Sequence, residues 1–200
     1  MTNETRRQRD PDRKARILAA AADLAGRTSF HDVSMADIGA EAGIVGSGIY
    51  RHFDSKTSIL IALLDRVMNR ISSGAEDIAK VTTDDSETLS ALVSDHIRIA
   101  IDDRNVLAVY HREVDNLPEE DRRRLRRLQR LYIEEWVHVL APLRSDLTDQ
   151  EARLTVHAAI GAIQSILNFN PELPDDRLTE LLSQMAHACL GVDPARTPRG

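Results

Sequence analysis

The chain has 200 residues, enough for one large or two small domains, and 42% of them are hydrophobic. No stretch approaches the roughly 18 consecutive apolar residues of a membrane-spanning helix, and the polar, Arg-rich N-terminus lacks the apolar segment of a signal peptide. The single cysteine, Cys189, excludes an internal disulfide. We therefore expect a cytoplasmic protein with no membrane partner.

The net charge of −6 argues against a protein that coats polyanions in general. The basic side chains are nevertheless concentrated at the N-terminus: Arg6, Arg7, Arg9, Arg13, Lys14 and Arg16. DNA affinity requires a local basic footprint rather than a basic protein. We interpret residues 1–9 as a disordered arm, which either contacts DNA or serves only as a solubilising tail.

The first predicted helix begins at Asp10 and Pro11, because proline at the first helical position gives up no hydrogen bond that the helix needs. Its apolar side chains recur at helical spacing along one face: Ile17, Leu18, Ala21, Leu24 and Ala25. The segment from Gly26 to Asp32 links it to the next helix. We expect Phe30 to fill the core of a small N-terminal domain.

A second helix is predicted to begin at Ser34, which stands three residues before Asp37 in the spacing of a capping box. Its apolar residues share one face: Met35, Ile38 and Ala42. Gly43 ends this helix, because a residue that tolerates positive φ is favoured there.

A third short helix is predicted over residues 46–53, where Ile49 and Phe53 are four residues apart and can both point inward. Three polar or amphipathic residues are left on the outside: Tyr50, Arg51 and His52. Two short helices joined by a Gly-containing turn form a helix-turn-helix motif, here at about 34–53, whose second helix is shaped to enter a DNA major groove.

This motif resembles the signature of TetR-family repressors in two runs: Ile38-Gly39-x-x-Ala42-Gly43-Ile44, then Ile49-Tyr50-Arg51-His52-Phe53-x-Ser55-Lys56. The match covers about a quarter of the chain and fixes about ten positions at set spacing. Two positions depart from the family pattern, since Val45 replaces its usual Ser and Ser47 its usual Gly. Contacts to individual bases are therefore not carried over.

The resemblance implies an all-α, homodimeric regulator with two domains. Residues 1–57 would form the helix-turn-helix domain, and residues 58–200 the domain that binds a ligand and dimerises. The DNA-contacting residues carried over are Ser34, Met35, Gly46, Ser47, Gly48, Tyr50, Arg51, His52 and Lys56.

Within this set, the Tyr50 hydroxyl and the Lys56 ammonium suit phosphate oxygens, while Arg51 can reach a phosphate or a guanine edge. The alternative interpretation is an ordinary solvated helix face. Gly46, Ser47 and Gly48 are small, which allows the backbone to approach DNA closely or simply forms a tight turn.

The remaining helices are predicted from their apolar periodicity. The helix that starts at Lys56 carries an apolar stripe from Ile59 to Ile71, and Ser72, Ser73 and Gly74 are expected to bend or break it. Residues 82–88 are predicted as a polar connector. Further helices are expected over 89–101, about 106–114, 118–140, 148–168 and 175–191.

The two last helices are the predicted dimer interface, because TetR-family proteins pair through their last two long helices. The first of them has small side chains that let a neighbour approach closely. The interface residues that we expect are Ala158, Ala162, Ser165, Leu181 and Met185.

The predicted ligand pocket lies among aromatic and aliphatic side chains of the C-terminal domain: Ile97, Leu107, Tyr110, Tyr132, Trp136 and Phe169. Each of these is equally consistent with plain core. Their character favours a small hydrophobic effector. The six arginines between Arg122 and Arg130 are most simply an exposed face, and otherwise a site for the phosphates of an acyl-coenzyme A.

The rival class is a helical enzyme or metal carrier such as a ferritin-like protein. Such a protein needs two Glu-x-x-His pairs on facing helices, and the sequence has only Glu135-x-x-His138. We therefore predict no catalytic residues, no metal and no cofactor. A second rival keeps operator DNA as the partner but makes the protein an activator or a ligand-independent regulator.

Overall fold

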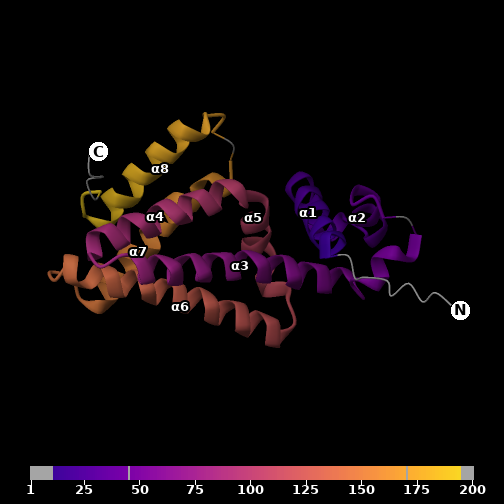
Figure 1. The fold of residues 1–200 in the computed structure, drawn as a ribbon, viewed down its shortest axis with the longest axis horizontal. Coiled ribbons are helices and arrows are strands. Elements are labelled where there is room, and N and C mark those ends of the chain that lie inside the picture. The colour runs from indigo at the N-terminus through magenta and orange to yellow at the C-terminus, as the bar shows by residue number, and fades with distance from the viewer. Residues whose placement is uncertain (1–10, 45, 170, 195–200) are drawn as a thin grey trace, which may run out of the picture. The chain divides into compact units, whose positions relative to one another are not determined.

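The computed structural model describes residues 11–44, 46–169 and 171–194, and these residues form helices and turns with no strand (Figure 1). The all-α prediction is confirmed. The chain divides into two compact units, the first ending at Leu63 and the second beginning at Leu64. No helix of the described ranges is both long and apolar enough to cross a membrane. The predicted arm at 1–9 lies outside the described residues.

The N-terminal unit consists of short helices around a small apolar core. They are α1 (Pro11–Arg27), the 3₁₀ helix η1 (Phe30–Asp32), α2 (Met35–Glu41), the 3₁₀ helix η2 (Gly46–Arg51) and the start of α3 (Lys56–Val81). The buried side chains come from every one of these elements: Ile17, Ala21, Ala25, Phe30, Ile38, Ile49 and Ile59. Phe30 is 3% exposed, so its predicted place in this core is confirmed.

Helix α2 has the predicted start and end. The Ser34 hydroxyl accepts a hydrogen bond from the Asp37 amide at 3.1 Å, and the Asp37 carboxylate accepts one from the Ser34 amide at 2.9 Å. The Ser34 hydroxyl also donates to the Asp37 carboxylate at 2.6 Å, and this bond, together with the one from the Ser34 amide, lowers the pKa of Asp37. After α2, Gly43 has φ +67°, in the left-handed region that glycine adopts without strain.

The C-terminal unit is a bundle built from the rest of α3 and five further α-helices. These are α4 (Asp85–Asp102), α5 (Arg104–Glu113), α6 (Glu119–Leu143), α7 (Asp149–Gln164) and α8 (Asp175–Leu190). Two 3₁₀ turns, η3 (Val114–Asn116) and η4 (Ser165–Leu167), follow α5 and α7. Helices α4 and α7 each pack against both α6 and α8.

Two predictions about the ends of helices are wrong. Helix α3 does not break at Ser72, Ser73 and Gly74, because its buried stripe continues to Ala75. A Cβ atom added to Gly74 would lie too close to an oxygen of the Asp95 carboxylate on α4, so a larger residue there would require that side chain to move. The polar connector is also shorter than expected, since α4 begins at Asp85.

Helix α3 is tied by ion pairs to other helices of the C-terminal unit. Arg70 bridges to Asp102 at 2.7 Å and to Asp103 at 2.5 Å, at the corner where α4 ends and α5 begins. The Arg124 guanidinium of α6 pairs with Asp65. The part of α3 that belongs to this unit therefore has polar as well as apolar attachments to its neighbours.

Two glycines should respond in opposite ways to the same substitution. Gly43→Ala places a side chain at φ +67° and should lower the free energy of unfolding by about 1 kcal/mol. Gly161 lies inside α7, and a Cβ atom added to it would meet no atom within 4 Å. Gly161→Ala should therefore raise the free energy of unfolding by about 0.5–1 kcal/mol. Thermal unfolding of both variants at equal protein concentration provides the measurement. Equal effects of one sign would contradict the backbone argument.

Candidate functional site

The helix-turn-helix region has a tight turn between α2 and η2. The Ile44 amide donates to the Gly39 carbonyl at 2.8 Å, which closes the turn after Gly43. The segment predicted as a second short helix is a 3₁₀ helix, η2, with Ile49 and Phe53 buried as expected. A Cβ atom on Gly48 would lie 2.8 Å from the Ile44 side chain, so a larger residue there would force that side chain to move.

The residues predicted to contact DNA are largely accessible. Tyr50 is 56% exposed, and Ser47 and Arg51 are exposed beside it in η2. His52, just after η2, is half-buried. At the start of α2, Ser34 is exposed as the helix cap, and Met35 is half-buried. The unit thus presents a hydroxyl, a phenol and a guanidinium on η2, groups that suit phosphates and base edges.

Lys56 has a structural role in addition to any contact with DNA. Its ammonium donates to the carbonyl oxygens of Phe30 at 3.1 Å and His31 at 2.8 Å, and it lies 5.4 Å from the centre of the Phe30 ring. These contacts fasten η1 to the start of α3. An ammonium group has three N–H donors, so one is left that can reach a phosphate. The predicted phosphate contact remains a prediction.

The residues predicted to line a hydrophobic pocket lie partly in the core and partly on the surface of the C-terminal unit. Five of them are buried in the C-terminal core: Ile97, Leu107, Tyr110, Tyr132 and Trp136. Phe169, the sixth, lies after η4 and is 59% exposed. Tyr132 and Trp136 meet around His96 of α4, with ring centres 5.6 Å and 6.1 Å from the His96 ring. The Trp136 indole nitrogen is buried and has no hydrogen-bond partner among the described residues.

A chain of polar contacts runs from this aromatic cluster toward α5 and α7. The Tyr132 hydroxyl lies 3.0 Å from His96 Nδ1, and His96 Nε2 lies 3.2 Å from Gln164 Nε2. The other end of the Gln164 amide, Oε1, lies 3.1 Å from His111 Nε2. We call these four side chains the Gln164 relay. An amide nitrogen only donates, so His96 Nε2 accepts, and the His96 proton resides on Nδ1.

Burial sets the protonation of the inner part of the relay. Burial and, as the smaller cause, the charge of His111 together lower the pKa of His96 to about 4. Burial also raises the pKa of the Tyr132 hydroxyl. Both groups are therefore neutral near pH 7, as expected for hydrogen-bonded groups in a core.

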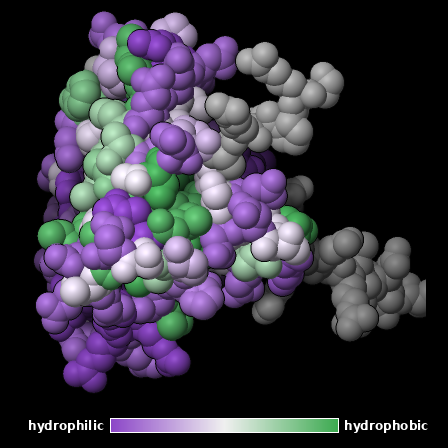
Figure 2. Space-filling view, turned by 90° about the vertical axis from the view of Figure 1, so that its left-hand side faces the viewer, coloured by the Kyte–Doolittle hydropathy of each residue, from purple (hydrophilic) through white to green (hydrophobic). Residues whose placement is uncertain are grey.

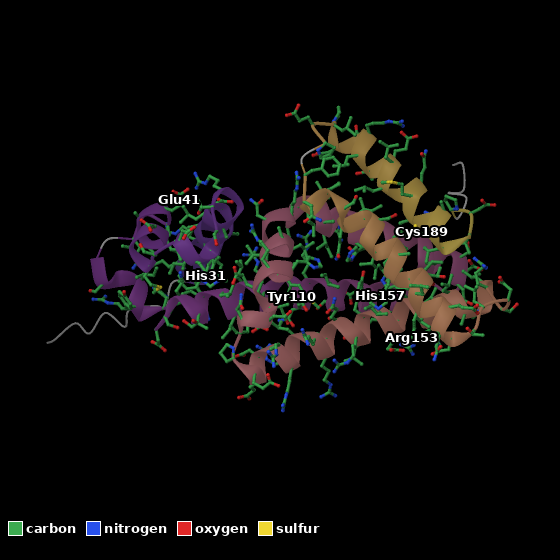
Figure 3. The ribbon with its side chains drawn as sticks, turned by 180° about the vertical axis from the view of Figure 1, so that it is seen from behind. His31, Glu41, Tyr110, Arg153, His157 and Cys189 are labelled. Atoms are coloured by element: carbon green, nitrogen blue, oxygen red, sulfur yellow. The ribbon has the colours of Figure 1, made fainter. Side chains whose placement is uncertain are left out.

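A pocket of about 470 Å³ lies at the outer end of the relay, between α5, α7 and η4. It is lined by Ala108, His111, Arg112, Gly161, Gln164, Ser165, Leu167 and Asn168. Figure 3 shows the molecule from behind, with Tyr110 of α5 and His157 of α7, one helical turn before Gly161, labelled. Of the residues singled out from the sequence for a site, only Ser165 lines this pocket, and it was predicted as a dimer contact.

Sequence reasoning missed this pocket because its polar residues come from separate helices and form no motif. One local signal existed. Gly161 lies in the middle of α7, where glycine is less stable than alanine. A glycine in such a place usually has a packing or functional reason.

The arginine run on α6 is mostly engaged in ion pairs. Arg122 and Arg123 both pair with Glu119, Arg124 pairs with Asp65 and Asp121, and Arg126 pairs with Asp115. A phosphate would have to displace these carboxylates. The geometry favours the simpler interpretation of the run, an exposed face with a network of salt bridges.

The predicted dimer residues lie on α7, η4 and α8, and α7 and α8 pack closely against each other. Ala158 and Met185 are exposed, while Ala162, Ser165 and Leu181 are half-buried. Leu154, one turn before Ala158, is 71% exposed. Figure 2 shows hydrophobic side chains reaching the surface among hydrophilic ones on the face that includes the C-terminal end of α8. A second protein chain could cover such side chains.

The single Glu-x-x-His pair is also on the surface. Glu135 and His138 are both exposed on α6. Within the described ranges, no three His, Cys, Asp or Glu side chains are grouped so that they could hold a metal ion.

Comparison with known proteins identifies both units. The family model "Bacterial regulatory proteins, tetR family" matches residues 17–63, and the model "Tetracyclin repressor-like, C-terminal domain" matches residues 82–169. The transcriptional activator FasR of Mycolicibacterium smegmatis is 32% identical over 82 residues, which are 41% of this chain and 37% of FasR. The transcriptional repressor KstR2 of Rhodococcus jostii is 29% identical over 129 residues, 64% of this chain and 63% of KstR2.

The matched segments thus span less than two thirds of the length of either relative. Among solved structures, AibR in complex with isovaleryl coenzyme A and operator DNA has a TM-score of 0.73 and 18% identity. The likeness covers 86% of this chain and 97% of that one, and it extends the agreement in fold across both units. On the two family matches and this shared fold, the chain belongs to the tetR family of bacterial regulatory proteins.

Proposed function

We propose that this protein is a sequence-specific DNA-binding transcriptional regulator that binds a near-palindromic operator as a homodimer and is released by a small ligand. The proposal rests mainly on which side chains of the N-terminal unit are accessible. Its helix-turn-helix segment buries Ile49 and Phe53 while Ser47, Tyr50 and Arg51 stay accessible for a DNA backbone and groove.

The dimer follows from the need to meet two half-sites together. Half-sites one helical turn apart lie about 34–36 Å from each other, so two recognition segments must be held at that separation. The exposed apolar residues Leu154 and Met185 on α7 and α8 support pairing through these helices. A shift of a few ångströms between the two recognition segments would weaken the double contact, which is how a distant ligand can release DNA.

Release by an effector makes the protein a repressor in the simplest arrangement. The relatives include a repressor and an activator by name: KstR2 is named a repressor and FasR an activator. Repression is our first choice because ligand release needs only loss of the DNA contact. An activator or a ligand-independent regulator remains the alternative. AibR was solved with isovaleryl coenzyme A, which favours an acyl metabolite as the class of effector to test here.

Sequencing of DNA fragments selected by the purified protein tests the proposal directly. A near-palindromic consensus with two half-sites is the expected result, and a metabolite extract should reduce recovery of those fragments. Recovery of fragments without a shared sequence would contradict sequence-specific regulation. Fragments that are recovered equally with every extract would favour the ligand-independent alternative.

Substitutions on η2 should weaken binding to every operator sequence alike. Arg51→Gln removes an exposed cation and should reduce the slope of log affinity against log salt by about one unit if Arg51 contacts a phosphate. Tyr50→Phe removes one hydroxyl donor and should weaken binding by roughly tenfold or less, with an unchanged slope. Fluorescence anisotropy across a salt series measures both quantities.

Arg127→Gln serves as the matched control, because Arg127 is an exposed arginine on α6 in the other unit. Its affinity and slope should equal those of the wild type. If Arg51→Gln behaves like this control on all operators, η2 does not provide the phosphate contact that we assign to it. Loss of binding at one base position only would instead assign Arg51 to a guanine edge.

A further inference from the structure

The pocket between α5, α7 and η4 has the size of a small-molecule site. Its volume of about 470 Å³ falls within the range of about 300–1,000 Å³ that is typical of ligand pockets. Three separate chain segments contribute to its wall, with Ala108 on α5, Gly161 on α7 and Leu167 in η4 as its least polar parts. It lies wholly within the C-terminal unit.

The polar groups of the wall favour an anion. Arg112 provides guanidinium donors, Ser165 a hydroxyl and Asn168 an amide, while His111 Nε2 already donates to Gln164 Oε1. No Asp or Glu is among the described residues that line the pocket. A guanidinium can hold a carboxylate or a phosphate through two parallel hydrogen bonds. A cationic ligand would find no carboxylate partner in this described wall.

The wall is held in place from inside the protein. Gln164 is fixed at both ends of its amide, by His96 at 3.2 Å and by His111 at 3.1 Å. His96 is in turn 1% exposed and 3.0 Å from the Tyr132 hydroxyl. The inner members of this chain, His96 and Tyr132, are buried, and hydrogen-bonded polar groups in a core are held rigidly. The Gln164 amide in the pocket wall therefore has a fixed support.

The pocket also borders the predicted dimer interface. Ser165 is both a wall residue and a predicted interface residue, and Gly161 precedes the predicted interface residue Ala162 on α7. Gly161 leaves open space where any other residue would place a Cβ atom. A ligand seated here would press on α7 directly, so its binding would reach the helix that sets the spacing of the dimer.

We propose that this pocket is the effector site and that it binds a small aliphatic carboxylate, with the carboxylate against Arg112 and Ser165 and the chain along Ala108 and Leu167. This rests on the proposed function, since it names the effector of that regulator. It also moves the site away from the buried Tyr132 and Trp136 side chains and away from the α6 arginines, most of which are paired.

Calorimetric titration of the full chain with hexanoate tests the chemistry of the site, with hexanamide as a neutral molecule of the same shape. Hexanoate should bind at least about tenfold more tightly, because hydrogen bonds to a charged group contribute more than neutral ones. Equal affinity for the two compounds, or no affinity for hexanoate, would overturn the proposal. Binding of hexanoyl-coenzyme A without binding of hexanoate would overturn it as well.

Variants of the wall test the location. Ala108→Leu fills the pocket from α5, away from the predicted interface, and should weaken hexanoate binding by at least about tenfold. Ala108→Ser keeps the volume and should bind within about twofold of the wild type. Arg112→Gln should remove the preference for hexanoate over hexanamide, whereas Arg127→Gln on α6 should retain it. Circular dichroism and thermal unfolding establish that each variant is folded.

Operator release is measured separately so that the two proposals can fail independently. If hexanoate binds as described but the protein selects no operator, the proposed function is wrong and the carboxylate site stands. If the operator is bound and an active compound releases it equally from the wild type and from Ala108→Leu, the effector site is elsewhere. Parallel loss of hexanoate binding and of release in Ala108→Leu and Arg112→Gln supports the site.

Discussion

Ala162→Arg should convert the protein to monomers and abolish tight operator binding. Ala162 is half-buried on α7, on the flank that also carries the exposed Leu154 and Ala158. If a second copy packs on this flank, the arginine places an unpaired charge in a closely packed interface, which costs several kcal/mol. Sedimentation velocity measures the oligomeric state, and anisotropy with a full and a half operator measures the effect on DNA binding.

Ala141→Arg is the matched control, because Ala141 is an exposed alanine near the end of α6 and receives the same added charge. It should remain dimeric. The Ala162→Arg monomer should keep its affinity for a half operator, since the helix-turn-helix unit is unchanged, and should lose the gain from joining two half-sites. A dimeric Ala162→Arg protein would place the interface on another surface.

The elements that were predictable from the sequence are those whose signals are local. Ser34 with Asp37 forms a capping box in the structure, as its spacing predicted, and Thr148 with Glu151 forms a second one with the same spacing. Gly43 adopts the positive φ that its place after α2 required. In each case the hydrogen bonds or the backbone torsion involve residues within four positions of one another. The spacing of residues in the sequence is therefore enough to predict the local geometry.

Features that depend on contacts between distant segments were not predictable in this way. Gly74 was expected to weaken α3, but the helix continues through it, and the space beside it holds the Asp95 carboxylate of α4. Lys56 matched a phosphate-binding position, and the carbonyl groups that it binds belong to η1, about 25 residues earlier. The Gln164 relay joins four helices through side chains that carry no signal of their own in the sequence. Periodicity identifies which residues are buried and gives no information about which of them meet.

His96 should make the protein lose stability in mildly acidic solution. Its pKa is lowered by burial from 6.5 to about 4, so between these values the unfolded chain binds a proton that the folded chain does not. The free energy of unfolding therefore falls as the pH decreases from about 6.5 toward 4, and the contribution of His96 is intact above this window. Between pH 7 and pH 4.5 the loss from this one group is about 2 kcal/mol.

His96→Gln isolates that contribution, because an amide can still hydrogen-bond to Tyr132 and Gln164 but does not titrate. Carboxylates also titrate in this range, so the informative quantity is the difference between wild type and variant across the pH series. We expect this difference to change by about 2 kcal/mol, with the variant less sensitive to acid. His138→Gln, at an exposed position on α6, should follow the wild type.

Urea unfolding at constant protein concentration is the appropriate measurement, because dimerisation makes stability depend on concentration. If the His96→Gln and wild-type curves run parallel, His96 takes up a proton in the folded protein, and its side chain is not sealed from solvent as its burial implies.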